Sequence, residues 1–342
     1  MGTSTPDGHV DVPISRQCAH LGGTPDPYPP GMTLHPQARA LLDRLGPSDG
    51  PPDLATVAAH RADARTEALA QPDRVPLEHV ADLDADGVPV RLYRPRRGAP
   101  VALYVHGGGW MFHDLETHDA FCRYLADATG WALLAVDYRR APEHPYPAPL
   151  DDVQTAARWL RAHAAGHDVD ATWLPGIGDS SGANLLAGLT VREPSALDLQ
   201  VLMYPPTDRR WRLDTAADTA ALTGTEMDWF WEQYAPGWLG DSPDVSVLRA
   251  PDLSRVPPTL VVTAEHDPLA AQGRAYATAL AEAGVEVVGF ETFGQVHSFW
   301  RQPATMDASR ALVPMVGALL DSHRARHHSR PDGHSRRPDG HR

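Results

Sequence analysis

The chain of 342 residues contains no lysine, only two cysteines and no long apolar run. A membrane-spanning helix needs about 18 or more apolar residues in a row, so the sequence predicts no such helix and no membrane partner. Cys18 and Cys122 are too few for a disulfide framework, and their spacing does not suggest a metal site. We interpret them as reduced thiols.

The sequence also lacks an excess of positive charge and the pattern of a secretory signal. Its formal net charge is −14, and all 30 basic residues are arginine. Phosphate binding requires clustered positive charge, so this balance argues against nucleic acid as a partner. The start, MGTSTPDGHVDVP, has neither the basic stretch nor the apolar stretch of a signal peptide. We therefore expect a cytoplasmic location.

Both ends of the chain differ in composition from the middle. Residues 1–32 are rich in proline, glycine and polar residues without an apolar period, which predicts a poorly ordered arm. Residues 322–342 contain the pentapeptide Arg-Pro-Asp-Gly-His twice. Its histidines could hold a metal, but its proline and glycine favour a disordered tail, so no metal site is expected there.

Between these ends, short apolar runs alternate with helical patterns. The runs are typical of strands buried in a parallel sheet, and they include VALYV from residue 101, WALLAV from 131, LQVLMY from 199 and TLVVTA from 259. Strand, helix and strand in sequence predict an α/β fold, in which helices cover both faces of a mostly parallel sheet.

Two segments fall outside this alternation. Residues 33–75 are helix-prone, and residues 205–250 interrupt the alternation with a group of aromatic side chains. The second segment is interpreted either as a helical cap that lines a pocket or as an insertion whose rings only pack onto the core. Both interpretations remain open for each ring.

The pentapeptide GDSSG at 178–182 lies where an apolar run meets a helical stretch. The pattern Gly-x-Ser-x-Gly is typical of a sharp turn from strand to helix, in which Gly178 and Gly182 leave room for Ser180 to project as a nucleophile. The helix behind it would point its N-terminal amides at the reacting group. Pro175 argues against this interpretation, because proline in a central strand forfeits a hydrogen bond.

A second glycine motif, HGGGW at 106–110, directly follows an apolar run. Bare backbone at such a place approaches a substrate closely and offers the N–H donors that an oxyanion hole requires. The alternative is a merely flexible turn. We prefer the donor interpretation, because the motif follows a predicted strand and precedes a serine elbow in the same chain.

A serine hydroxyl is a weak nucleophile at neutral pH, so it needs a histidine base and an orienting carboxylate. Asp267 follows the apolar run 259–264, and His297 follows the strand-like run VEVVGF, which places serine, acid and histidine in the expected order. Glu265 and His266 are rivals of Asp267. Asp267 is preferred, because its Asp-Pro pair favours a turn that fixes the carboxylate.

Five motifs occur in one order along the chain: HGGGW from 106, DYRRAPEHPYPAPLDDV from 137, GDSSGAN from 178, DPL from 267 and HSF from 297. This order resembles the hormone-sensitive-lipase-like family of α/β-hydrolases, the bacterial carboxylesterases, over about residues 33–320. The resemblance implies an eight-stranded sheet in a core over 76–321. It also implies a helical cap formed by 33–75 and by the insertion at 205–250.

The resemblance also implies roles for individual residues: the nucleophile Ser180, the base His297, the acid Asp267, and an oxyanion hole made by the N–H groups of Gly108, Gly109 and Ser181. Candidate pocket residues are His113, Trp110, Trp229 and Phe230. The chain departs from the family pattern at Ser181, where alanine is common, and at His113 and Asp114, where small residues are frequent. His113 could narrow or polarise the pocket.

These groups together predict a serine carboxylesterase that hydrolyses short-chain acyl esters or acetylated small molecules through an acyl-enzyme. The chemistry requires no metal and no organic cofactor. One alternative is a tailoring deacetylase, lactonase or acyltransferase that acts on a specialised metabolite. The other is a ligand-binding module without catalysis. The expected partner is a small-molecule ester, and the oligomeric state is left open, with a homodimer among the candidates.

Overall fold

The computed structural model describes residues 33–48, 50–71, 74–213 and 215–329. The predictions for the arm at 1–32, for Cys18 and for the repeated pentapeptide lie outside the described residues. The helices are α1 (Pro36–Leu45), α2 (Val57–Leu69), α3 (Leu115–Thr129), α4 (Ala148–His163), α5 (Ser181–Arg192), α6 (Gly224–Tyr234), α7 (Ala270–Glu282) and α8 (Asp307–His328). The strands are β1 (His79–Ala85), β2 (Val88–Arg94), β3 (Ala99–Val105), β4 (Ala132–Val136), β5 (Val169–Asp170), β6 (Pro175–Asp179), β7 (Leu199–Met203), β8 (Thr259–His266) and β9 (Val287–Val296).

The strands form one sheet in the order β1-β2-β4-β3-β6-β7-β8-β9, and the two-residue β5 pairs with β3. Among the pairs of described strands, only β1–β2 and β2–β4 are antiparallel. The predicted α/β fold with a mostly parallel sheet is therefore confirmed. Eight strands lie on the main path as expected, and β5 adds a ninth.

The four apolar runs singled out in the sequence became β3, β4, β7 and β8, the central part of the sheet. Every residue of β3, β4, β6 and β7 is buried, as expected for parallel strands covered on both faces. Pro175 does not disturb this arrangement. It is the first residue of β6, a position where proline is tolerated in a strand. Pro175 pairs with Leu199 of β7, and pairing with β3 starts one residue later, at Gly176.

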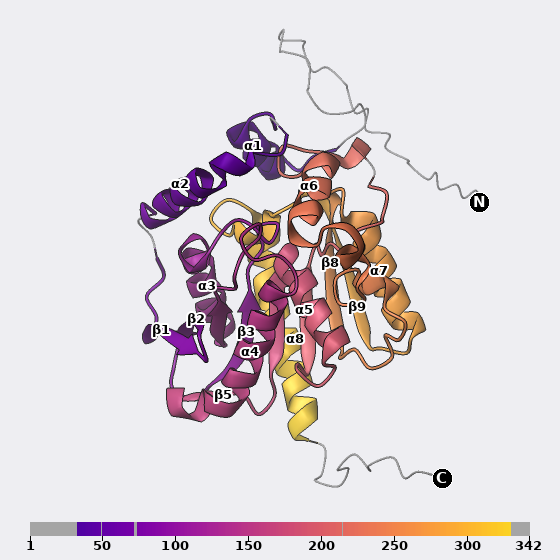
Figure 1. Cartoon of the computed structure of the whole chain (residues 1–342). Coiled ribbons are helices and arrows are strands. Elements are labelled where there is room, and N and C mark those ends of the chain that lie inside the picture. Colours follow the sequence, from indigo (N-terminus) through magenta and orange to yellow (C-terminus); the bar gives the residue numbers. More distant parts are fainter. Residues whose placement is uncertain (1–32, 49, 72–73, 214, 330–342) are drawn as a thin grey trace, which may run out of the picture. The chain divides into compact units, whose positions relative to one another are not determined.

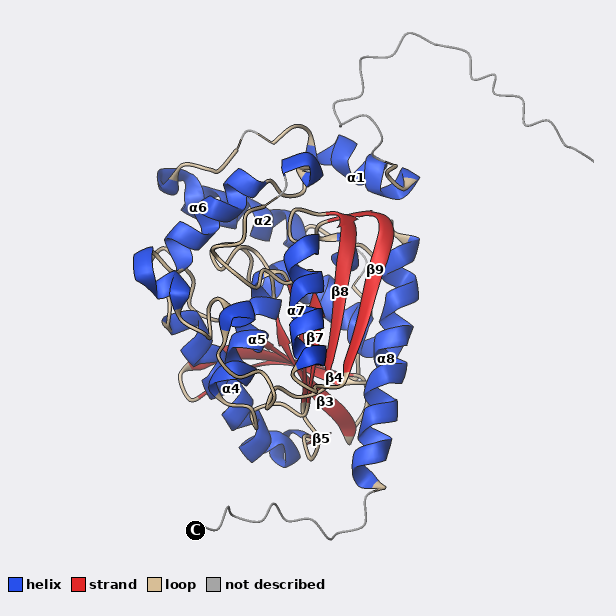
Figure 2. Cartoon of the chain, turned by 90° about the vertical axis from the view of Figure 1, so that its right-hand side faces the viewer, coloured by secondary structure: helices blue, strands red, loops and turns tan. Residues whose placement is uncertain are grey.

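Helices cover the two faces of the sheet. Figure 2 shows α8 on one face and α4 and α5 on the other. On the first face α3 packs beside α8, and on the second α4 packs beside α5. Helix α7 packs against β8 and β9. The helices α1, α2 and α6, which we call the cap helices, lie together on the side of the sheet where the parallel strands end (Figure 1).

The last helix is longer than the sequence suggested. The predicted disordered tail began at residue 322, but α8 continues to His328 and ends with a basic last turn of Arg326, His327 and His328. Positive charge at the carboxyl end of a helix interacts favourably with its dipole. Residues 322–328 thus belong to α8 and not to a disordered tail. Residues 330–342 lie outside the described part of the chain.

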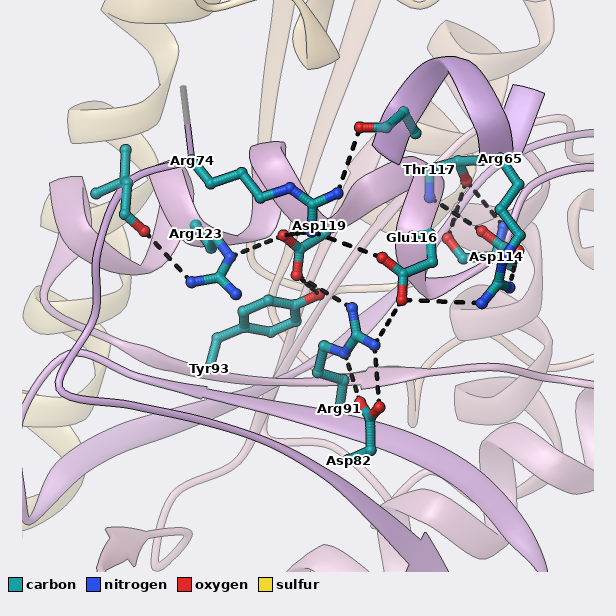
Figure 3. A network of polar contacts seen from close by, with 12 residues as sticks. Arg65, Arg74, Asp82, Arg91, Tyr93, Asp114, Glu116, Thr117, Asp119 and Arg123 are labelled. Atoms are coloured by element: carbon teal, nitrogen blue, oxygen red, sulfur yellow. Dashed lines mark hydrogen bonds and ion pairs between the residues drawn. The ribbon is translucent and has the colours of Figure 1, made fainter. Parts of the chain in front are cut away.

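A partly buried network of arginines and carboxylates joins the cap side to the sheet (Figure 3). At its centre is Asp119 of α3, which is fully buried. Its carboxylate accepts hydrogen bonds from Arg74 and Arg123 at 2.7 Å and from Arg91 and the Tyr93 hydroxyl at 3.1 Å. The network ties the segment after α2 to α3 and β2, and the forked guanidinium groups of Arg74 and Arg91 each contact more than one carboxylate.

Because Asp119 balances three guanidinium groups, we expect the substitution Asp119→Asn to lower the free energy of unfolding by about 3 kcal/mol, the effect of removing one partner from a buried ionic network. Urea unfolding measures this loss. Asp127→Asn, at an exposed position of the same helix, is the matched control and should change stability by less than about 0.5 kcal/mol. Equal stability of the two variants would contradict the assignment.

Candidate active site

Ser180 lies at the turn between β6 and α5 in a conformation that is rare for L-residues. Its φ is 52° and its ψ is −123°. The backbone is held on both sides of this strain, because the Ser180 N–H donates to Met203 O at 2.9 Å and the Ser180 carbonyl accepts from Asn184 N at 3.1 Å. Strain of this kind persists only where the surroundings determine it, which is typical of functional sites.

The two glycines of the motif are required by space. A Cβ atom on Gly182 would collide with the carbonyl oxygen of Val105 at the end of β3, and a Cβ on Gly178 would lie 2.8 Å from the backbone carbon of Gly182. Only glycine allows the elbow to come this close to the neighbouring strand. The structure therefore shows the sharp strand-to-helix turn that the sequence predicted.

The three predicted polar side chains meet at this turn. His297 Nε2 lies 3.0 Å from Ser180 Oγ, and His297 Nδ1 lies 2.7 Å from Asp267 Oδ2. A carboxylate only accepts, so Nδ1 carries the hydrogen and Nε2 is left to accept the serine proton. The other oxygen of Asp267 accepts the N–H of Leu269 at 2.9 Å, which fixes the carboxylate. All three residues are buried.

The rivals of Asp267 point elsewhere. Glu265 accepts the N–H of Gly294 at 2.7 Å, and His266 Nε2 lies 3.2 Å from the carbonyl oxygen of Thr33. Glu265 thus holds the backbone of β9, and His266 holds the backbone before α1. Of the three neighbouring candidates, Asp267 alone is hydrogen-bonded to His297.

The glycine loop after β3 emerges beside the elbow. Strands β3 and β6 are parallel neighbours, with Val105 opposite Gly178, so their carboxyl ends lie at the same sheet edge. A Cβ on Gly107 would lie 3.1 Å from the Cβ of Ser180. The loop continues through Gly108 and Gly109, with φ values of 124° and 59°. The N–H of Ser181 begins α5 on the other side of the nucleophile.

Below the loop lies a buried polar cluster. Asp179 Oδ1 accepts hydrogen bonds from the Tyr104 hydroxyl at 2.9 Å and from Gly107 N at 3.1 Å. His118 Nε2 lies 3.8 Å from the same carboxylate, and Arg301 Nε lies 3.5 Å from it. Burial by itself would raise the pKa of Asp179, but His118, Arg301 and Tyr104 together hold that pKa below its ordinary range. Asp179 is thus a charged anchor next to the nucleophile.

The same cluster contains histidines that stay neutral. Burial lowers the pKa of His106 to about 3, and His118 adds to the effect. Burial also lowers the pKa of His118 and, more strongly, that of His113. The ring of His106 stacks on Tyr138 with centroids 4.4 Å apart, and its Nδ1 lies 2.8 Å from the carbonyl oxygen of Gly107.

The predicted pocket residues divide into two groups. Phe230 of α6 lies against Gly109, because a Cβ on this glycine would collide with the ring, and Trp229 lies 5.3 Å from Phe230 in an edge contact. Trp110, by contrast, is fully buried and stacks on Tyr234 at 4.5 Å. Its ring also contacts Trp231, so it has no free face for a substrate and Trp110 packs in the core instead of lining a pocket.

The structure also assigns positions that sequence reasoning missed. Asp179 was only the variable residue of the serine motif, although a charged residue at the end of a buried strand is a signal that it must be paired. Arg61 of α2 donates to Met111 O and Ala141 O, each at 2.7 Å, and pairs with Glu143 at 2.8 Å. No local sequence pattern distinguishes Arg61 from Arg65, the other arginine of α2.

Other sites are few in the described part of the chain. Its His, Cys, Asp and Glu side chains form no group of three or more that could hold a metal ion. Nor does any of its helices have the length and apolar character to cross a bilayer. A surface cavity of about 530 Å³ lies between α6 and two nearby segments. Ser180, Asp267 and His297 are not part of its lining, which consists of Arg209, Arg210, Asp228, Trp231, Glu232, Gly237, Trp238 and Asp241.

The suppressed ionisation of His106 has a consequence for stability. Between pH 6.5 and about pH 3 the unfolded chain binds a proton that the folded protein does not, so the free energy of unfolding falls as the pH decreases. At pH 5 this amounts to about 2 kcal/mol for a histidine of this kind. We expect His106→Gln to recover most of that loss.

Urea unfolding at pH 7, 6 and 5 measures the loss in the wild type and in His106→Gln. His144→Gln, at an exposed position, is the control and should keep the wild-type dependence on pH. The assignment is wrong if the wild type and His106→Gln lose stability equally between pH 7 and pH 5.

Known proteins resemble this chain along most of its length. A family model described as an alpha/beta hydrolase fold matches residues 102–301. The ethyl acetate hydrolase of Pseudomonas putida is 37% identical over 265 residues, which cover 73% of this chain and 83% of that protein. The carboxylic ester hydrolase LipN of Mycobacterium tuberculosis is 36% identical over 323 residues, covering 85% of this chain and 84% of that protein.

Solved structures agree with these relatives. The hyperthermophilic esterase of the archaeon Pyrobaculum calidifontis superposes with a TM-score of 0.78 at 32% identity, and the match covers 85% of this chain and 99% of that one. The family model spans more than half of the chain, and the relatives exceed 30% identity over more than two thirds of it. The chain therefore belongs to the hormone-sensitive-lipase-like carboxylesterase family of the α/β-hydrolase superfamily, and it is a carboxylic ester hydrolase.

Proposed function

We propose that Ser180, His297 and Asp267 are the catalytic triad of this esterase. The observation that supports the proposal is the continuous hydrogen-bonded chain from Asp267 through His297 to Ser180, with distances of 2.7 and 3.0 Å. The N–H groups of Gly108, Gly109 and Ser181 are proposed as the oxyanion hole, because the glycine loop and the start of α5 flank the nucleophile on its two sides.

In the proposed reaction Ser180 Oγ attacks the ester carbonyl carbon while His297 Nε2 takes the hydroxyl proton. Asp267 stabilises the imidazolium that results. The carbonyl oxygen becomes an oxyanion held by the backbone donors, and each such donor is worth about 2.7–4 kcal/mol in the transition state. The intermediate collapses, and the alcohol leaves with the proton from His297. Water then attacks the acyl-enzyme by the same steps and releases the acid.

We propose short-chain acyl esters or acetylated small molecules as substrates. Phe230 lies against Gly109, Trp229 contacts Phe230, and Phe112 contacts Phe230 from the glycine loop with centroids 6.0 Å apart. Aromatic rings beside the proposed oxyanion hole favour substrates with compact apolar groups. The name of the Pseudomonas putida relative, ethyl acetate hydrolase, supports a small acyl group. A deacetylase, lactonase or acyltransferase would use the same acyl-enzyme with a different substrate or acceptor, and product analysis separates these outcomes.

We also propose a cytoplasmic location for the protein. Its support is the scarcity of cysteine, with only two in the chain. The described one, Cys122, is a buried free thiol, and burial raises its pKa. A thiol in this state is unreactive and needs no oxidising compartment.

A homodimer is proposed through β9. This strand of ten residues is at the edge of the sheet and pairs with β8 alone among the described strands. It exposes Phe293 to 74%, together with Val288 and Phe290. The backbone of an edge strand is complementary to a second copy of itself across a two-fold axis, and this pairing would cover the apolar side chains. The occupant we propose is therefore a second copy of this chain.

The triad is tested by Ser180→Ala. Without the nucleophilic oxygen, hydrolysis of p-nitrophenyl acetate by the purified protein should fall by a factor of at least about 10⁴. Circular dichroism and the melting temperature should stay close to those of the wild type, because one buried hydroxyl is removed without a change of fold. Unchanged turnover in the folded variant would reject the assignment.

The acid is tested by a matched pair of neighbours. Asp267→Asn removes the charge that orients His297, and kcat should fall by about 10³ to 10⁴. Glu265→Gln changes a carboxylate that contacts Gly294, so its kcat should remain within about twofold of the wild type. The reverse order of the two effects would transfer the acid role to Glu265.

The dimer is tested by light scattering coupled to size-exclusion chromatography. We expect a wild-type dimer, and we expect Phe293→Glu to be monomeric, because two like charges would then face each other in the apolar contact. Trp238→Glu is the control, since Trp238 is 79% exposed but lies after α6 on the cap side. A monomeric wild type, or a dimer that survives Phe293→Glu, would overturn the proposed interface.

A further inference from the structure

We propose that His113 is a positioning residue for the oxyanion hole, because it holds the carbonyl of Gly107 and thereby fixes the direction of the Gly108 N–H. The proposal rests on the proposed function, in which the Gly108 N–H binds the oxyanion. It assigns a purpose to a side chain that no motif of the sequence explains. The reasons lie in the peptide unit between Gly107 and Gly108 and in the backbone of His113 itself.

An oxyanion hole works only if its donors are aimed before the reaction starts. A run of three glycines is the least rigid backbone that a protein can place there, since glycine adopts positive and negative φ with similar ease. Gly108 has a φ of 124°, a conformation that other residues rarely adopt. The direction of its N–H must therefore be fixed by contacts from outside the glycine run.

The structure shows such contacts on the peptide unit that carries this N–H. The carbonyl oxygen of Gly107 accepts from His106 Nδ1 at 2.8 Å and from His113 Nδ1 at 3.3 Å, and these two donors use both of its lone pairs. Upstream, Gly107 N donates to Asp179 at 3.1 Å. Because a trans peptide is planar, holding the oxygen of Gly107 on one side directs the N–H of Gly108 to the opposite side.

The protonation state of His113 suits this contact. Burial lowers the pKa of His113 well below its usual range, and Arg301, His118 and His106 add to the effect, against the opposing charge of Asp179. The imidazole is therefore neutral at pH 7 and carries one hydrogen. That hydrogen is on Nδ1, because a carbonyl oxygen cannot donate. An accepted hydrogen bond also polarises the peptide and strengthens its N–H as a donor.

The backbone of His113 indicates that the side chain is needed. Its φ is 68°, a left-handed conformation that glycine adopts without strain and histidine does not. The conformation is held in place, because Arg140 donates to the His113 carbonyl and Asp114 caps the first turn of α3 through Thr117 N at 2.9 Å. A residue whose only task was to turn the chain would be better as glycine.

The proposal is tested with His113→Gly and His113→Asn. Glycine relieves the left-handed strain but removes the donor, so kcat should fall about tenfold while KM changes less than about twofold. Asparagine tolerates the left-handed conformation, and its Nδ2 is bonded to Cγ as Nδ1 is in histidine, so kcat should stay within about threefold of the wild type. Binding of a trifluoromethyl ketone, which mimics the oxyanion, should weaken with kcat.

A second readout does not depend on turnover. In ¹⁵N relaxation spectra the Gly108 amide should be ordered in the wild type and in His113→Asn, and it should become mobile in His113→Gly. Asp86→Gly relieves the same kind of backbone strain at an exposed turn between β1 and β2, and it should change neither kcat nor the Gly108 amide. This control separates the lost donor from a general effect of relaxing the backbone.

Two results would overturn the role of His113. One is a His113→Gly protein with wild-type kcat and a wild-type Gly108 amide, and the other is a His113→Asn protein that loses as much as His113→Gly. If Ser180→Ala leaves turnover unchanged, the proposed function fails instead. The order of the Gly108 amide in the two His113 variants then still decides whether His113 positions this peptide.

Discussion

The close approach of two backbones at one sheet edge is the constraint on which the rest of the site depends. Gly182, at the start of α5, touches the carbonyl of Val105 at the end of β3, and no side chain fits between them. This contact brings the elbow of β6 against the loop of β3, so that a strained serine and a bare run of glycines share one small space. Each half of the proposed chemistry needs the other half at this distance.

Glycine gives this closeness but no rigidity, and buried polar groups supply what glycine cannot. Asp179 lies between the nucleophile and the loop and binds the backbone of Gly107, while His106 and His113 bind the same residue from its other end. The charge of Asp179 is balanced by Arg301, whose Nε lies 3.5 Å from its carboxylate. Polar contacts to Gly107 thus replace the side chains that the loop lacks.

Features that depend on neighbours in the chain were predictable from the sequence. The elbow follows from Gly178 and Gly182, and the order of serine, acid and histidine led to Asp267 and His297. Features that depend on distant contacts were not predictable in this way. The pairing of β5 with β3 involves only two residues on each strand, and the burial of Trp110 depends on Tyr234 in a helix more than a hundred residues away.

The cap helices contact the glycine loop and the segment that follows it. Arg61 of α2 donates to the carbonyls of Met111 and Ala141, and Phe230 of α6 lies against Gly109. One cap helix therefore holds the segment that follows the glycine run, and another touches the run itself. A displacement of either helix must therefore change contacts of the loop. The positions of the cap helices and the aim of the proposed donors are thus parts of one packing arrangement.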